Sequence, residues 1–248
     1  MRLGLIQSRG IGDIIIALPI ADYFIERGWE VCWPIDEQFV PFFAAAKPEI
    51  RFIPLKRDEG RFFYETPLAM LNDLGCKQIT VLYSHLKGHN VSHAQLALSL
   101  KFDEYKYAVA GVPFSKKWDL RIKRDPAREM ELTSRLQITR PYICVHKAGS
   151  NFDATGSLDL PKRWTDQYQF VDITPVTDNP FDWISVLERA SKLVLIDSCF
   201  SNLVEQLNMT AEKYLLLRSD VSSTPVMKNG WKFIAKIPPA GGELSVKQ

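Results

Sequence analysis

Short apolar runs alternate with longer runs of helical period along most of this chain. Short runs bounded by polar residues or glycine are typical of buried strands, and apolar residues at every third or fourth position are typical of helices. The expected strands are 2–7, 30–34, 50–54, 78–83, 142–146, 168–173, 192–196 and 213–217, with later helices at 180–190 and 200–208. This alternation predicts the α/β class, with parallel sheets joined by crossover helices.

The first two expected strands are joined by the clearest helix of the sequence. It ends before Gly28 and contains Pro19, which predicts a kink because a mid-helix proline removes a backbone hydrogen bond. One face at a period near 3.6 carries Ile14, Ala17, Leu18, Ala21, Phe24 and Ile25. The segment therefore predicts a βαβ unit.

The alternation loosens once, in a stretch rich in Lys, Asp, Tyr and Pro at 101–126, which is followed by a helical pattern at 127–137. We therefore predict two Rossmann-like domains with a cleft between them, in a compact arrangement. The predicted ranges are 1–100 for the N-terminal domain, 101–138 for the connection and 139–248 for the C-terminal domain. Residues 229–248, which contain the run Pro-Pro-Ala-Gly-Gly at 238–242, are expected to form a poorly ordered tail.

Length and composition fit this division. A chain of 248 residues accommodates two small domains, and its 46% hydrophobic and 24% charged residues are typical of a globular protein. The 31 Lys and Arg nearly balance the 29 Asp and Glu, so the net charge of +2 gives no global reason to expect a nucleic-acid or membrane partner.

The four cysteines lie in or beside apolar runs and form no CxxC pair, which predicts reduced thiols. No apolar stretch approaches the ~20 residues that span a bilayer. The apolar start of the chain is too short for a signal-peptide core. We therefore expect a soluble, cytoplasmic protein without a transmembrane segment.

The loop after the first strand carries the first candidate chemistry, at residues 8–13 (Ser-Arg-Gly-Ile-Gly-Asp). Its glycines allow a tight turn from strand to helix. A dinucleotide fingerprint needs a third glycine where Ile15 stands, and it has no carboxylate at the helix start, so Asp13 argues against phosphate binding here. Asp13 is either a helix-start carboxylate that interacts with the helix dipole or a general base at the carboxyl end of the strand.

Residues 8–19, Ser-x-Gly-x-Gly-Asp-Ile-Ile-x-Ala-Leu-Pro, resemble the N-terminal motif of the ADP-heptose:lipopolysaccharide heptosyltransferases and their relatives in glycosyltransferase family 9. Two weaker matches follow in the second half, at 145–150 with 162–164 and at 195–203. The resemblance implies the GT-B fold, with the acceptor bound by the first domain and a nucleotide-sugar donor by the second. It also implies that no catalytic metal or further cofactor is required.

Carried over to this sequence, the resemblance makes Asp13 the candidate base and Lys162 the lysine that meets the donor diphosphate. It places the segment from Ser198 to Asn202 near the donor. The relatives usually have Asp-Thr-Gly-x-x-His at this point, whereas residues 197–202 read Asp-Ser-Cys-Phe-Ser-Asn and lack both the glycine and the histidine.

Two polar segments of the second half support a donor site on their residue types alone. A turn after the strand that ends at His146 offers amides, a hydroxyl and a cation to a diphosphate, although an ordinary polar turn has the same composition. A helix start after 192–196 offers unpaired amides. The candidate donor residues are Lys147, Gly149, Ser150, Asn151, Lys162, Ser198, Ser201 and Asn202.

His85, His89 and His93 have the spacing that would align them on one helix. A glycine and an asparagine between them break a helix, and no carboxylate or cysteine lies close by in sequence, so we expect no metal site. Contact with the acceptor and solvated loop histidines both remain open. The candidate acceptor-binding residues are Gly12, His85 and His89.

These observations predict a metal-independent, inverting glycosyltransferase for hexosyl or heptosyl transfer, with Asp13 as the base. The partners are a nucleotide-sugar donor and an acceptor hydroxyl, which a glycan, a protein or a modified nucleobase can supply. One alternative is a non-catalytic nucleotide- or sugar-binding module of the same fold. Another is an NAD-dependent oxidoreductase, for which Asp36 stands about where a ribose-binding acid belongs.

Overall fold

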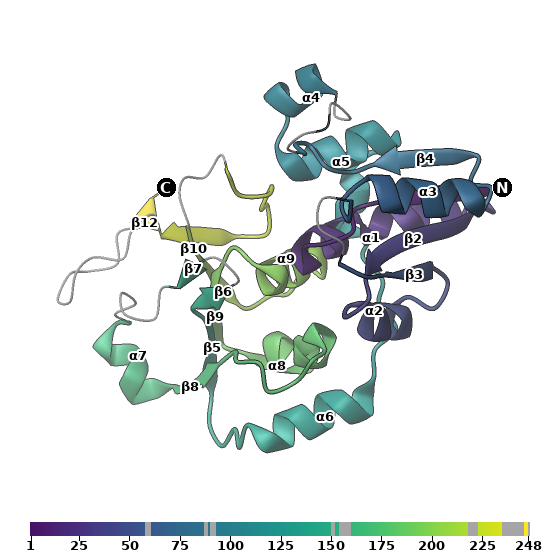
Figure 1. Ribbon diagram of the computed structural model, residues 1–248. Coiled ribbons are helices and arrows are strands. Elements are labelled where there is room, and N and C mark those ends of the chain that lie inside the picture. Colours follow the sequence, from purple (N-terminus) through teal and green to yellow (C-terminus); the bar gives the residue numbers. More distant parts are fainter. Residues whose placement is uncertain are drawn as a thin grey trace. The chain divides into compact units, whose positions relative to one another are not determined.

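The computed structural model (Figure 1) describes residues 1–57, 61–86, 89, 93–149, 152–153, 160–217, 223–234 and 246–247. The chain forms two units, Met1–Lys123 and Arg124–Gln248, each with its own sheet. The boundary lies inside the segment 101–138 that the sequence assigns to a connection. The first part of that segment contains α5 (Phe102–Ala110), which packs on the first unit, and the second part contains α6 (Pro126–Arg135), which packs on the second.

The first unit contains a parallel sheet in the order β3-β2-β1-β4. Its strands are β1 (Arg2–Ile6), β2 (Glu30–Asp36), β3 (Arg51–Leu55) and β4 (Gln78–Val81). After their first residues β1 and β2 are buried throughout, as expected for central strands covered on both faces. The sequence predicts all four strands to within two residues.

The helices of this unit are α1 (Ile11–Ile25), α2 (Val40–Ala46), α3 (Glu65–Asp73), α4 (Ala94–Ser99), α5 and the 3₁₀ helix η1 (Phe114–Trp118). The sequence predicts α1 with one apolar face, but in the structure nearly every side of this helix is buried. The reason is that α5 and η1 pack against α1 in addition to the neighbouring β2. Pro19 lies inside α1 and is itself buried.

The second unit contains a sheet in the order β12-β11-β10-β9-β5-β8, parallel except for the β11–β12 pair. Its strands are β5 (Tyr142–His146), β8 (Gln169–Asp172), β9 (Lys192–Ile196), β10 (Glu212–Leu216), β11 (Trp231–Ile234) and β12 (Val246–Lys247). The prediction of a poorly ordered tail from 229 is wrong for β11. This strand pairs in parallel with β10 and buries Trp231 and Ile234.

The remaining elements of the second unit are a small hairpin and short helices. They are β6 (Ala148–Gly149), β7 (Phe152–Asp153), α6, α7 (Lys162–Gln167), the 3₁₀ helix η2 (Pro180–Trp183), α8 (Ile184–Arg189) and α9 (Cys199–Gln206). The helix predicted at 180–190 is therefore a 3₁₀ turn continued by α8. No helix among the described residues is long and apolar enough to cross a bilayer.

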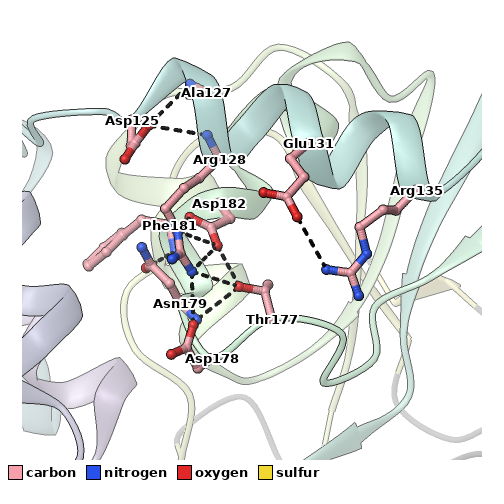
Figure 2. A network of polar contacts seen from close by, with 10 residues as sticks. All are labelled: Asp125, Ala127, Arg128, Glu131, Arg135, Thr177, Asp178, Asn179, Phe181 and Asp182. Atoms are coloured by element: carbon pink, nitrogen blue, oxygen red, sulfur yellow. Dashed lines mark hydrogen bonds and ion pairs between the residues drawn. The ribbon is translucent and has the colours of Figure 1, made fainter.

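Arg124, just before α6, and Arg128, in its first turn, attach this helix to the rest of the second unit, and Figure 2 shows the contacts of Arg128. Arg128 donates to the buried carboxylate of Asp182, at 3.0 Å from Nε to Oδ1 and 2.9 Å from Nη2 to Oδ2, and also to Asp178. Arg124 donates from Nη1 to both carboxylate oxygens of Glu188 in α8. The first helix after the boundary is thus fixed to η2 and α8 of its own unit.

Each sheet has a point at which the chain reverses its direction of strand addition. In the first unit β2 and β3 extend the sheet on one side of β1, and β4 then joins β1 on the other side. In the second unit β8 joins one side of β5, and β9 joins the other. Ligands of open parallel sheets bind outside the carboxyl ends of the strands at such a reversal. The fold therefore directs attention to the residues after β1 and β4 and to those after β5 and β9.

Candidate functional site

The carboxylate of Asp13 lies in the first turn of α1, directly after the turn that follows β1. Gly10 makes this turn with φ +85°, a conformation that favours glycine. A Cβ atom on Gly10 would lie 2.6 Å from Oδ2 of Asp13. The glycine therefore leaves room for the carboxylate, whose side chain is 39% exposed. Gly12 has no positive φ and is an ordinary helix residue, so only Gly10 of this pair makes the tight turn.

A buried lysine from α5 holds the other oxygen of this carboxylate. The Nζ atom of Lys106 lies 3.0 Å from Oδ1 of Asp13. It also donates to Oε1 of Gln7 at 2.7 Å and to the carbonyl oxygen of Leu82 at 3.2 Å. An ammonium group has three N–H donors, and these three acceptors use all of them. Lys106 thus connects the ends of β1 and β4 to Asp13, and sequence analysis missed it.

Tyr83, two residues after β4, lies at the same edge of the sheet as the loop before α1. Its hydroxyl accepts a hydrogen bond from the backbone N–H of Ser8 at 2.9 Å, and its ring contacts Phe63 edge to face, with 6.0 Å between centroids. Burial raises the pKa of Tyr83 to about 12, which keeps the phenol neutral at physiological pH. Tyr83 therefore fixes the loop before α1 without adding charge beside Asp13.

The two candidate acceptor histidines lie after β4 but have different surroundings. His85 is exposed. The Nε2 atom of His89 lies 3.4 Å from Oε1 of Glu65, and its ring lies against Tyr64 with 5.4 Å between centroids. The predicted acceptor contacts thus include one solvated histidine and one that belongs to a cluster with α3.

The histidines do not share a helix, because α4 begins only after His93. Among the described residues no group of three His, Cys, Asp or Glu side chains is close enough to hold a metal ion.

Asp36, at the end of β2, bears on the oxidoreductase alternative. Its Oδ2 atom accepts hydrogen bonds from both Nε and Nη2 of Arg57 at 2.9 Å, and its Oδ1 accepts from the backbone N–H of Gln38 at 3.2 Å. The side chain is almost fully buried. A ribose-binding acid must be accessible to the ligand, whereas Asp36 is buried and its carboxylate is already bound by Arg57 and the Gln38 amide. This arrangement disfavours a dinucleotide site.

At the second unit's reversal point a hydrogen bond joins the two strand ends. Nδ1 of the buried His146, at the end of β5, lies 3.0 Å from Oγ of Ser198, which follows β9. The next residue, Lys147, lies 3.1 Å from a carboxylate oxygen of Asp172 at the end of β8. Lys147 is therefore ion-paired within the protein, and it must exchange this partner in order to meet a diphosphate.

The side chains of two predicted donor residues form hydrogen bonds with the backbone at the start of α9. Ser201 Oγ accepts from the N–H of Ser198 at 2.9 Å and donates to the Ser198 carbonyl oxygen at 2.8 Å. The amide of Asn202 donates to the same carbonyl oxygen at 3.0 Å. Both side chains are buried, so here they form the cap of the helix and are not exposed to a ligand.

The remaining donor candidates lie on β6 and α7. Gly149 is exposed in the β6–β7 hairpin, whereas Ser150 and Asn151 lie outside the described residues. Lys162 is the first residue of α7 and is exposed, and within the described part of the chain its ammonium has no hydrogen-bond or ion-pair partner. The helix is anchored by the buried Trp164, which packs against Tyr214.

Comparison with known proteins places this geometry in context. No family model matches the chain, and no curated protein does. Among solved structures, a family 9 glycosyltransferase from Veillonella parvula DSM 2008 superposes with a TM-score of 0.62 and 14% identity, covering 94% of this chain and 86% of that one. The heptosyltransferase WaaC of E. coli with ADP has a TM-score of 0.52 and 13% identity, covering 94% and 92%. The chain has the fold of the family 9 glycosyltransferases.

A third GT-B neighbour is longer than this protein. The iron-containing dodecameric glycosyltransferase TibC of enterotoxigenic E. coli H10407 has a TM-score of 0.56 and 14% identity. The chain spans 61% of the length of TibC while 92% of its own residues are covered. These likenesses confirm the predicted α/β class and GT-B architecture. At such identities they establish the fold alone.

Proposed function

We propose that this protein is a glycosyltransferase that moves a sugar from a nucleotide-diphosphate-sugar to an acceptor hydroxyl. The observation that carries the proposal is the Asp13 carboxylate at the reversal point of the first sheet, in a chain with the GT-B fold. Neighbours of the same fold have been solved with ADP-D-beta-D-heptose and with ADP. The proposed donor class is therefore the nucleotide-diphosphate sugars.

In the proposed reaction Asp13 accepts the proton of the acceptor hydroxyl as its oxygen attacks the anomeric carbon. The bond between that carbon and the donor diphosphate breaks, and the nucleoside diphosphate leaves with the electron pair. Attack from the side opposite the leaving group inverts the anomeric configuration. Proton transfer of this kind contributes typically about 10²–10⁴-fold to a rate.

Positive charge for the leaving diphosphate is proposed to come from the second unit. Lys162 is exposed, and binding of a phosphate by its ammonium would break no hydrogen bond or ion pair to another described residue. Lys147 can add a second charge if it exchanges Asp172. Two lysines near a developing diphosphate supply the electrostatic stabilisation that usually dominates such catalysis, so we propose that no metal is needed.

Asp13→Asn is the substitution that tests the proposed base. Asparagine keeps the shape of the side chain, and its amide oxygen can still accept the hydrogen bond from Lys106. The variant should therefore fold and bind the donor, with a lower melting temperature because the buried ammonium loses its counter-charge. Transfer should fall roughly 10²–10⁴-fold, because the amide cannot accept the proton. Donors are first selected by a thermal-shift screen of nucleotide-diphosphate sugars, since a ligand that binds only the folded state raises the melting temperature. Wild-type turnover in a well-folded Asp13→Asn protein eliminates Asp13 as the base.

A binding module without catalysis is the second candidate, and one observation favours it. Asn202, which stands where the relatives have the histidine, is buried and hydrogen-bonds together with Ser201 to the backbone of Ser198 at the start of α9. The two functions separate in one assay. A donor that raises the melting temperature but is neither transferred nor hydrolysed supports the module, whereas release of the nucleoside diphosphate supports the enzyme.

A further inference from the structure

The three acceptors around Lys106 differ in what they can do. Gln7 Oε1 and the Leu82 carbonyl oxygen belong to the ends of β1 and β4, and their hydrogen bonds join two strands. The third acceptor, Asp13, belongs to α1 and is 39% exposed, whereas the Lys106 side chain is only 3% exposed. The buried ammonium of Lys106 therefore binds the carboxylate of Asp13 on the side that faces the protein interior, and the carboxylate remains partly exposed.

Burying the Lys106 ammonium lowers the free energy of unfolding unless its hydrogen bonds compensate for the lost hydration. The other buried residues of α5 are Asp103, Tyr105, Tyr107 and Ala110, and α5 packs against α1 and β4 (Figure 1). Removing an ammonium from water requires full compensation by hydrogen bonds, and an apolar residue of similar volume often serves stability as well. Helix packing alone does not require a charge here.

Another buried lysine of the same unit shows what a purely internal ion pair looks like. Lys117 Nζ lies 2.7 Å from Oδ2 of Asp103, and both side chains are fully buried. Neither member of that pair reaches solvent, so the pair can act only within the protein core. The Lys106 pair differs because its carboxylate is 39% exposed. Lys106 engages Oδ1, whereas Oδ2 has no partner among the described residues and occupies the space beside Gly10, 2.6 Å from where a Cβ atom would stand.

We propose that Lys106 is a positioning residue for Asp13, a role that rests on the proposed function of Asp13 as the base. The bond from Nζ to Oδ1 fixes the rotation of the carboxylate about its Cβ–Cγ bond, and Oδ2 becomes the oxygen that receives the acceptor proton. The acceptor oxygen forms the bond to the anomeric carbon while the bond from that carbon to the donor diphosphate breaks, and that electron pair leaves with the nucleoside diphosphate. The acceptor O–H bond breaks, its electron pair stays on the acceptor oxygen, and the proton passes to Oδ2. Lys106 keeps its own protons throughout, and the proton on Asp13 passes to water after the products leave.

A double-mutant cycle tests this role. The variants are Lys106→Met, Asp13→Asn and the double substitution, assayed by nucleoside diphosphate release with the donor selected by thermal shift, with ADP-heptose tried first. Lys106→Met should lower kcat about 10–100-fold with an unchanged donor KM, because a carboxylate misplaced by about 1 Å costs up to about 10²-fold. In the Asp13→Asn background the same substitution should cause no further loss, because residues that act as a unit are not additive.

Two additional variants separate positioning from stability. Lys117→Met removes the other buried lysine and should lower the melting temperature while leaving kcat within about twofold of the wild type. Lys106→Gln keeps a hydrogen-bond donor without the charge, and should fold and recover part of the rate lost in Lys106→Met. If Lys106→Met does not fold, Lys106→Gln replaces it in the cycle.

The possible results distinguish this inference from the proposed function. Wild-type turnover in Asp13→Asn overturns the proposed base and this inference together. An inactive Asp13→Asn beside a fully active Lys106→Met overturns the positioning role alone. Equal fold-losses from Lys106→Met in both backgrounds also overturn it, since they show an effect that does not pass through Asp13.

Discussion

Gly10 and Asp13 show how much of the proposed chemistry depends on single atoms. The missing side chain of Gly10 opens the space that Oδ2 of Asp13 occupies, and its positive φ directs the chain from β1 into α1. A side chain at residue 10 would therefore act on the reaction as well as on the backbone.

Gly10→Ala should lower both stability and rate. A left-handed conformation costs a residue with a Cβ roughly 1–2 kcal/mol, and the new methyl group would also displace the Asp13 carboxylate. We expect a lower melting temperature together with a loss of turnover of about tenfold or more. Gly28→Ala is the matched control, because Gly28 has φ +79° but nothing within 4 Å of an added Cβ. It should lose similar stability and keep its rate, and equal turnover in the two variants would show that residue 10 does not constrain Asp13.

Lys162→Ala should weaken the binding of nucleoside diphosphates by about 1–3 kcal/mol, the size of a charge-assisted hydrogen bond. Because Lys162 is exposed, stability should be unchanged. Titration calorimetry with the nucleoside diphosphate of the selected donor measures the effect, and Arg163→Ala, the exposed neighbour, is the control. Unchanged affinity in Lys162→Ala would remove this lysine from the donor site.

At the scale of elements, the apolar runs predicted the buried strands β1, β2, β5, β9 and β10, because buried parallel strands need unbroken apolar sequence. They did not predict the internal strand β11, in which Lys232 is exposed. The hydrophobic pattern indicated the helices between β2 and α6 less clearly than it indicated the strands. The short amphipathic patterns of these helices include polar residues that the fold buries, among them Lys106, Lys117 and Asp103. Lys106 lies between two tyrosines in α5, and all three are buried. A lysine among aromatic residues that the fold buries was the one sequence feature that could have indicated its role. Its partner in α1 could not be identified without the tertiary structure.

The first residue of β10 provides an element-scale test by pH. Burial alone would raise the pKa of Glu212, but hydrogen bonds from Lys192, Lys232 and Tyr214 outweigh burial and lower this pKa from 4.5 to about 2. The folded state thus binds this proton less readily than the unfolded state. Its contribution to stability is fully present above pH 4.5 and is lost as the pH falls toward about 2.

Glu212→Gln should therefore reduce the melting temperature near neutral pH and flatten its fall between pH 4.5 and about 2. Calorimetric scans across this range measure both effects. Glu131→Gln is a control on an exposed carboxylate of α6, 69% exposed and 3.9 Å from Arg135 (Figure 2). If wild type and Glu212→Gln show parallel pH profiles, the three hydrogen bonds at the start of β10 do not set the acid stability.

At the scale of the whole molecule, the sequence predicted two Rossmann-like units, but it did not place the boundary between Lys123 and Arg124. The sequence pattern does not reveal this boundary, because α5 and α6 follow one another in one polar stretch although they belong to different units. Of the predicted site, Asp13 lies at a reversal point and Lys162 is exposed. Ser201 and Asn202 are buried in a helix cap, which a motif comparison cannot reveal because capping depends on side-chain direction.

Treatment with EDTA should leave sugar transfer intact, because the proposed diphosphate charges are met by lysines. TibC contains iron, so the comparison is informative for this fold. The assay is turnover after dialysis against the chelator, with a mock-dialysed sample as the control. Loss of activity that iron, zinc or manganese restores would contradict the lysine-based donor site and return attention to the histidines after β4.

The chain passes from one unit to the other at a single point, and no described sheet contains strands from both units. Each described sheet is therefore built from one continuous half of this chain. A recombination event at this junction would exchange a complete half without separating any pair of hydrogen-bonded strands. Under the proposed function, exchange of the second half would change the donor and exchange of the first would change the acceptor, and the same junction is the natural site for constructing chimaeras.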